Sequence, residues 1–142
     1  ISPDWLNLRS ETYGILQRED TLKEIVKLLG PEALPDEEKL ILEVARMIKI
    51  GILQQNSFDD VDTYCSPEKQ FKLMKLQVDF YNQGQQALKD GASLADIRSM
   101  EVISSLLKAR MDVKDDEMDK LDKIGTDMVE QFKSVTGVKV QN

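Results

Sequence analysis

Residues Gln54–Gln70, QQNSFDDVDTYCSPEKQ, separate two amphipathic segments and therefore fix how the chain is divided into helices. The end of this stretch is a strong helix start, because Ser66 can cap a helix, Pro67 suits the first helical position and Glu68 complements the helix dipole. The beginning places a lone aromatic side chain, Phe58, among short polar ones. Loops held between rigid helices often carry binding groups, so this loop is a candidate site.

Helical periodicity continues on both sides of this loop. We expect a first helix that starts at Ser2–Asp4 and stops at Gly30–Pro31, a second helix capped by Asp36 that fades near Gln54, and a third that starts at Ser66 and ends at Gly91. Their apolar stripes are Leu8, Ile15, Leu22, Val26 and Leu29, then Ile41, Val44, Ala45, Ile48 and Ile52, then Phe71, Met74, Val78, Tyr81 and Leu88.

The C-terminal part is predicted to be helical as well. Ser93 and Asp96 have the spacing of a capping box for a short fourth helix, a fifth helix runs through Val102–Ala109, and a last one covers about 115–135. The last helix repeats apolar residues every seven positions, which is typical of a coiled coil, but a glycine in the seam favours packing on its own domain. Residues 138–140 alone have strand character. We therefore predict an all-α fold, a single bundle of five or six helices over residues 1–142.

Composition narrows the classes of function. The chain has 142 residues, 41% of them apolar and 32% charged, which suits one soluble domain. Its formal charge of −7 argues against nucleic acid as a partner, and no apolar run is long enough to insert into a membrane. The first residue is Ile1 and no leader-like segment follows it, so we expect a piece of a longer, non-secreted chain.

Catalytic and metal sites are not predicted. The sequence has no histidine, a single cysteine, Cys65, and no GxxxxGK[ST] phosphate loop, so we expect neither catalytic residues nor metal ligands. Cys65 precedes a helix start and could be reactive, but without a histidine partner a structural role is favoured. The acidic groups at 59–62 and 112–117 lack calcium-loop spacing and are interpreted as solvated turns and helix starts.

Two surfaces remain as candidates. Phe58 is either a plug of the bundle core or an aromatic wall for a ring-shaped ligand, with polar groups beside it from Gln55, Asn56 and Ser57. That wall is half a pocket, and another domain would supply the rest. The turn at residues 34–39, LPDEEK, is either ordinary helix capping or a negative knuckle that presses on a basic, moving partner.

The order of residues 28–76, LLGPEALPDEEKLILEVARMIKIGILQQNSFDDVDTYCSPEKQFKLMKL, resembles the C-terminal helical domain of the catalytic A subunit of archaeal-type and vacuolar-type rotary ATPases. The resemblance is strong over about residues 16–88 and weaker beyond them. It implies one C-terminal domain of a larger subunit, whose catalysis of ATP synthesis or hydrolysis, coupled to proton or sodium translocation, uses residues that this chain lacks.

The resemblance also implies roles for both candidate surfaces. Phe58 would pack against the adenine of ATP or ADP bound with Mg in the intact subunit, with Ser57, Asn56 and Gln55 at the border of the pocket. Leu34, Asp36, Glu37 and Glu38 would contact the central rotor shaft. The second helix, at roughly 18 residues and about 27 Å, would join the two as a rigid rod. The isolated piece is expected to bind no cofactor.

Partners follow from the same resemblance. They are the nucleotide-binding domain of the same subunit, non-catalytic B subunits in an alternating hexamer, and the rotor-shaft subunit, in a peripheral position on the cytoplasmic side of a membrane. The alternative is a free-standing helical adaptor that grips a partner helix with its six methionines.

Overall fold

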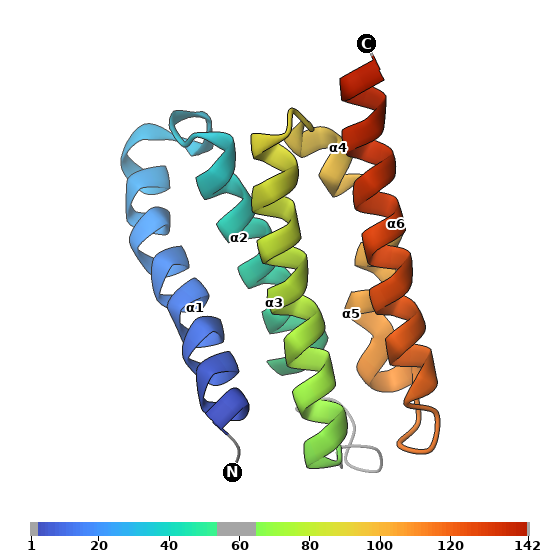
Figure 1. Ribbon diagram of the computed structural model, residues 1–142. Helices are drawn as coiled ribbons and strands as arrows, with labels where there is room; N and C mark the ends of the chain where they lie inside the picture. The colour runs from blue at the N-terminus through green and yellow to red at the C-terminus, as the bar shows by residue number, and fades with distance from the viewer. Residues whose placement is uncertain (1–2, 54–64, 142) are drawn as a thin grey trace.

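The computed structural model describes residues 3–53 and 65–141, with side chains described as far as residue 137 (Figure 1). Over these ranges the chain is helical, and the predicted all-α bundle is confirmed. The elements are α1 (Pro3–Leu29), the 3₁₀ turn η1 (Pro31–Ala33), α2 (Asp36–Ile48), the π-helical turn η2 (Lys49–Leu53), α3 (Pro67–Lys89), α4 (Leu94–Arg98), α5 (Val102–Asp112) and α6 (Asp119–Gln141).

Helix α3 occupies the centre of the bundle. It contacts α1 and α2 on one side and α5 and α6 on the other (Figure 1). Phe80, in the middle of α3, is fully buried, and its ring centroid lies 5.2 Å from that of Phe132 on α6. Gly84, one turn later, is so close to α2 that an added Cβ would lie 3.0 Å from Leu40 Cδ2. The core is therefore built around α3.

Two of the observed helix caps agree with those predicted from the sequence, and a third differs. Ser66 Oγ accepts a hydrogen bond from Lys69 N at 3.1 Å, and Ser93 Oγ accepts one from Asp96 N at 3.0 Å, so both predicted caps are confirmed. Asp36 is not the cap of α2. Pro35 takes that position without a side-chain bond, and Asp36 begins the helix as its first residue.

The predicted apolar face of α3 was too narrow. Met74 and Val78 are buried, but Phe71, Tyr81 and Leu88 are only partly buried. The reason is that α3 packs on both sides, so a single stripe cannot describe it. The further buried residues are Lys69, Leu73, Leu76, Gln77, Phe80, Gly84 and Ala87.

The last helix differs from its prediction at both ends. It starts at Asp119 because residues 114–117 form a turn in which Glu117 Oε1 accepts from Lys114 N at 3.0 Å. It continues through 138–140, so this stretch is helix and not strand. Leu121, Met128 and Phe132 are buried, which confirms that α6 packs on its own domain.

We predict that Phe132→Ala lowers the free energy of unfolding by about 3–5 kcal/mol, because it removes the ring that packs on Phe80. Val129→Ala, on the same helix but 38% exposed, should change it by no more than about 0.5 kcal/mol. Urea denaturation of the 142-residue chain measures both values. Equal small effects, or a change of oligomeric state with Phe132→Ala, would mean that α6 does not dock within its own chain.

Candidate functional site

The two surfaces predicted from the sequence are the loop around Phe58 and the turn at residues 34–39. Along the chain they flank the second helical segment on opposite sides. Gln55, Asn56, Ser57 and Phe58 lie outside the described residues. The described elements on either side of them, η2 and the start of α3, lie at the end of the bundle opposite to the start of α2 (Figure 1). Helix α2 and η2 together cover 36–53, the 18 residues expected of the rod, although the last turn is π-helical.

The other end of that segment is a tip formed by residues 28–38, which we call the α1–α2 tip. Leu28 and Leu29 are 84% and 71% exposed at the end of α1. Gly30 adopts a φ of 85°, which lets the chain reverse direction and enter η1. Leu34 is buried, so it seals the tip from inside and offers no side chain to a partner.

Acidic groups of the tip differ in how they are paired. Glu38 lies 3.7 Å from Arg18, and Glu32 accepts from Lys39 Nζ at 3.1 Å. Asp36 and Glu37 are exposed in the first turn of α2, and within the described part of the chain they form no ion pair. The tip thus presents two large apolar side chains beside two carboxylates that are open to a partner.

At the far end of α2, η2 is packed tightly against α3 and α5. An added Cβ on Gly51 would lie 2.9 Å from the carbonyl oxygen of Leu106 and 3.0 Å from Gln77 Nε2. Gln77 is buried in α3, and its Nε2 donates to the carbonyl oxygen of Met47 at 3.4 Å. A π-helical turn is often found beside functional sites, and here it leads directly into residues 54–64.

An ion pair between a buried carboxylate and a half-buried amine links the same turn to α1. Glu19 is 4% exposed, and its carboxylate pairs with Lys49 of η2 and, at 3.6 Å, with Lys23. The hydrogen bond with Glu19 raises the pKa of the Lys49 amine above its ordinary value, so the amine is charged at neutral pH. The pair therefore joins the middle of α1 to the end of the α2 segment.

On the other side of residues 54–64, Lys69 is a buried residue that sequence analysis missed. Its Nζ donates to the carbonyl oxygen of Arg110 at 2.8 Å and to that of Val113, so it caps the C-terminal end of α5. The feature of the sequence that indicates its role is the position of Lys69, three residues after the Ser66 cap. A capping box places Glu or Gln there, and a lysine opposes the helix dipole, which indicates another role.

Cys65 does not have the surroundings of a reactive thiolate. Burial raises the pKa of its thiol, an effect that the nearby charges of Arg110 and Lys69 counteract in part. The favoured structural role of Cys65 is consistent with this shift.

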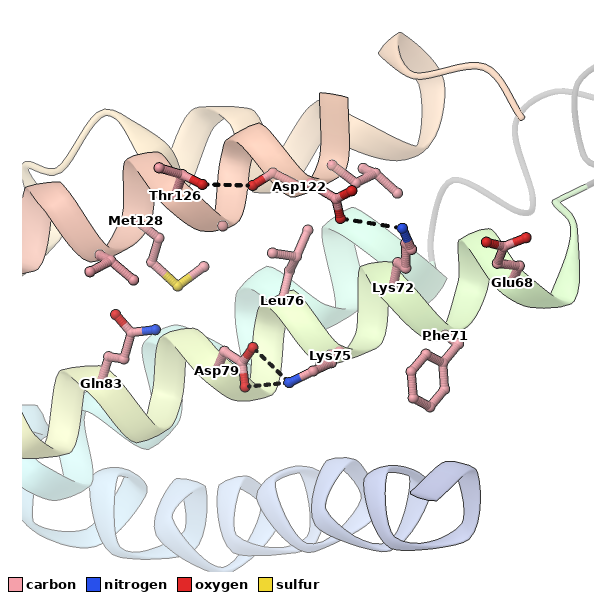
Figure 2. A pocket seen from close by; sticks show the side chains of 13 residues that line it. Glu68, Phe71, Lys72, Lys75, Leu76, Asp79, Gln83, Asp122, Thr126 and Met128 are labelled. Carbon is pink, nitrogen blue, oxygen red and sulfur yellow. Dashed lines mark hydrogen bonds and ion pairs between the residues drawn. The ribbon is translucent and has the colours of Figure 1, made fainter. Parts of the chain in front are cut away.

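An open groove of about 710 Å³ runs between α3 and α6 (Figure 2). Its floor includes Leu76 and Met128. Charged side chains along it pair with one another, Lys72 with Asp122 at 3.2 Å and Lys75 with Asp79 at 3.1 Å (Figure 2). The groove thus offers an apolar floor, and these ion pairs hold the charged groups that line it except Glu68.

Metal sites and membrane spans are absent from the described ranges. Among residues 3–53 and 65–141, no three side chains of the metal-binding types are grouped to hold an ion. None of the helices there combines the length and the apolar character that crossing a bilayer requires.

Comparison with known proteins points to one family. Residues 1–98 match the family model described as the C-terminal domain of V and A type ATP synthase. The chain is 43% identical over 138 residues to the A subunit of the A-type ATP synthase of Ignicoccus hospitalis, and 43% identical over 141 residues to that of Hyperthermus butylicus. It is 40% identical over 120 residues to the V-type ATP synthase alpha chain of Halothermothrix orenii.

These alignments cover 96%, 98% and 84% of this chain but 23%, 24% and 20% of the three relatives. The chain therefore spans about a quarter of the length of the relatives it matches.

We predict that Gly51→Ala destabilises the chain by about 1–3 kcal/mol, because the new methyl group meets the backbone of α5. Gly14→Ala is the matched control: it lies within α1 with no atom near the added Cβ, and it should stabilise the chain by about 0.5–1 kcal/mol. Thermal and urea unfolding of both variants measure the difference. A neutral Gly51→Ala would contradict the close approach of η2 to α5.

Proposed function

Because the chain belongs to the family of C-terminal domains of V- and A-type ATP synthases, we propose that it is a lever within the catalytic A subunit. In this proposal the domain transmits motion between a nucleotide site and the central rotor shaft. The whole subunit makes or hydrolyses ATP with Mg, coupled to proton or sodium translocation. The chemistry of phosphoryl transfer belongs to the nucleotide-binding domain of the same subunit.

The observation that carries the proposal is the α1–α2 tip. Leu28 and Leu29 are the two most exposed large apolar side chains among the described residues, and they are adjacent, so a partner could cover both. The same tip carries the exposed acidic residues Asp36 and Glu37. Such a surface suits a partner that has apolar side chains ringed by Lys or Arg, and the shaft subunit is the partner we propose. Glu38, half-buried and near Arg18, would support the tip from its side, and Leu34 would support it from within.

The second contact is proposed for the opposite end of the rod. Phe58 would form a wall for the adenine ring, bordered by Ser57, Asn56 and Gln55. Support for this comes from the two described flanks: Gly51 and Gln77 fix the turn before the segment, and Lys69 fixes the helix start after it. Segments with rigid flanks can transmit a displacement instead of absorbing it.

We propose the same assembly that the family resemblance implies. The domain would sit beside the nucleotide-binding domain of its own subunit, in a hexamer of alternating A and B subunits around the shaft. Its place would be peripheral, on the cytoplasmic side of the membrane.

The adaptor alternative loses its main support. It relied on methionine faces that grip a partner helix, but four of the six methionines, Met47, Met74, Met100 and Met128, belong to the core of the bundle. The seven-residue repeat of α6 is likewise used within the chain.

We predict that Asp36→Lys combined with Glu37→Lys lowers the number of ions moved per ATP in the intact complex, because it reverses the charge that the tip offers to the shaft. ATP affinity should stay unchanged. Glu11→Lys with Glu130→Lys, two exposed acids outside the tip, is the control with the same change of net charge. Unaltered coupling in the tip variant would rule out this lever surface.

We predict that Phe58→Ala in the intact complex weakens nucleotide binding by about 1–3 kcal/mol, the range for loss of a ring stacked on a base. Phe58→Tyr keeps a ring and should bind nearly as well as the parent. Fluorescent nucleotide titration measures both. Equal affinities of the alanine variant and the parent would count against an adenine wall, as would tight ATP binding by the isolated chain in calorimetry.

A further inference from the structure

We propose that Glu19 and Lys49 form a brace that fixes the register of the two arms of the lever, so that a load on the tip moves the arms together. The inference rests on the proposed function of the α1–α2 tip. It assigns the pair as positioning residues for the transmission of motion.

The acidic member of the brace is a carboxylate in an unusual position. Glu19 lies within α1, a helix on the outside of the bundle, yet it is 4% exposed (Figure 1). Transfer of a carboxylate from water to such a site is unfavourable unless it is paired. Lys49 and Lys23 provide the positive charges, the first from η2 and the second from one turn further along α1. Replacing such a pair by apolar groups is often neutral or stabilising, so the glutamate is not required for stability alone.

The remainder of the interface between the arms is largely apolar. Ile15 and Leu22 are buried on α1, and Ile41, Ala45 and Ile48 are buried on α2, which packs against it. Apolar contact resists separation of two helices but is not directional, and packed helices can shift along one another by small shear motions. An ion pair between fixed positions on the two arms opposes such a shift, because sliding would stretch it.

The position of the pair suits this task. At 1.5 Å per residue, about 14 Å of helix separates Glu19 from Leu28 in the tip, and about 20 Å separates Lys49 from Asp36. Sliding at this depth would absorb displacement before it reached the tip. The nearer pair, Arg18 with Glu38, has side chains 58% and 29% exposed, against 35% and 6% for Lys49 and Glu19, so solvent weakens it more.

The experiment distinguishes a role of the ion pair in keeping the two arms in register from a role in the stability of the fold. The double variant Glu19→Leu with Lys49→Met replaces the pair by apolar groups, which is often neutral or stabilising, but it removes the directional link. The single variant Lys49→Arg keeps the charge. The matched control is Asp79→Leu with Lys75→Met, the same replacement at a more exposed ion pair on α3. All are made in the intact rotary complex.

The measurements are the melting temperature, the rate of ATP hydrolysis and the number of ions moved per ATP against an opposing gradient. We expect the Leu/Met variant to melt at or above the parent, to hydrolyse ATP normally, and to move about half as many ions or fewer per ATP, because the arms slide under load. Lys49→Arg and the α3 control should couple like the parent.

Several outcomes would overturn the brace. Normal coupling by the Leu/Met variant would show that apolar packing holds the register, and so would an equal loss in the α3 control. A lower melting temperature accompanied by a proportional loss of hydrolysis would assign the pair to stability. If charge reversal at the tip also leaves coupling intact, the lever itself is wrong. If the tip variant uncouples and the Leu/Met variant does not, the brace alone fails.

Discussion

The packing of α3 between two layers is the constraint on which the rest of the structure depends. Gly84 brings α3 into contact with Leu40 of α2, and Phe80 stacks near Phe132 of α6 on the other side. Because both contacts come from neighbouring turns of one helix, neither layer can shift without disturbing the other. The α1–α2 pair is thereby packed on α3 at its inner face, while Leu28 and Leu29 of the tip are exposed.

This arrangement separates the two proposed contacts of the domain. One lies at the tip, where Leu28, Leu29 and the first turn of α2 face solvent. The other is proposed for the segment that follows η2, and the elements that flank this segment, η2 and the start of α3, lie at the end of the bundle opposite to the tip (Figure 1). Polar contacts toward the second end are those of Gln77 with the Met47 carbonyl, of Lys49 with Glu19, and of Lys69 with α5. Rigidity at one end and exposure at the other are what a lever requires.

Much of the fold could be predicted from local patterns. The caps at Ser66 and Ser93 and the stop at Gly30–Pro31 depend on neighbouring residues, and all three lie where the sequence placed them. Other predictions were less accurate, one because it depends on residues distant along the chain and one because of a local turn. The single apolar stripe assigned to α3 failed since the helix packs on both sides, and the start of α6 moved since Glu117 holds a turn before it.

For the candidate site, the sequence by itself determined the all-α class, most helix boundaries and, by resemblance, the family to which the chain belongs. It could place Asp36 and Glu37 at a helix start because that depends on local order along the chain. The tertiary structure decided that Leu34 is internal while Leu28 and Leu29 are open, and that Glu19 meets Lys49 and Lys69 meets α5. These last two contacts join residues far apart along the chain, and only packing of the helices brings such groups within bonding distance.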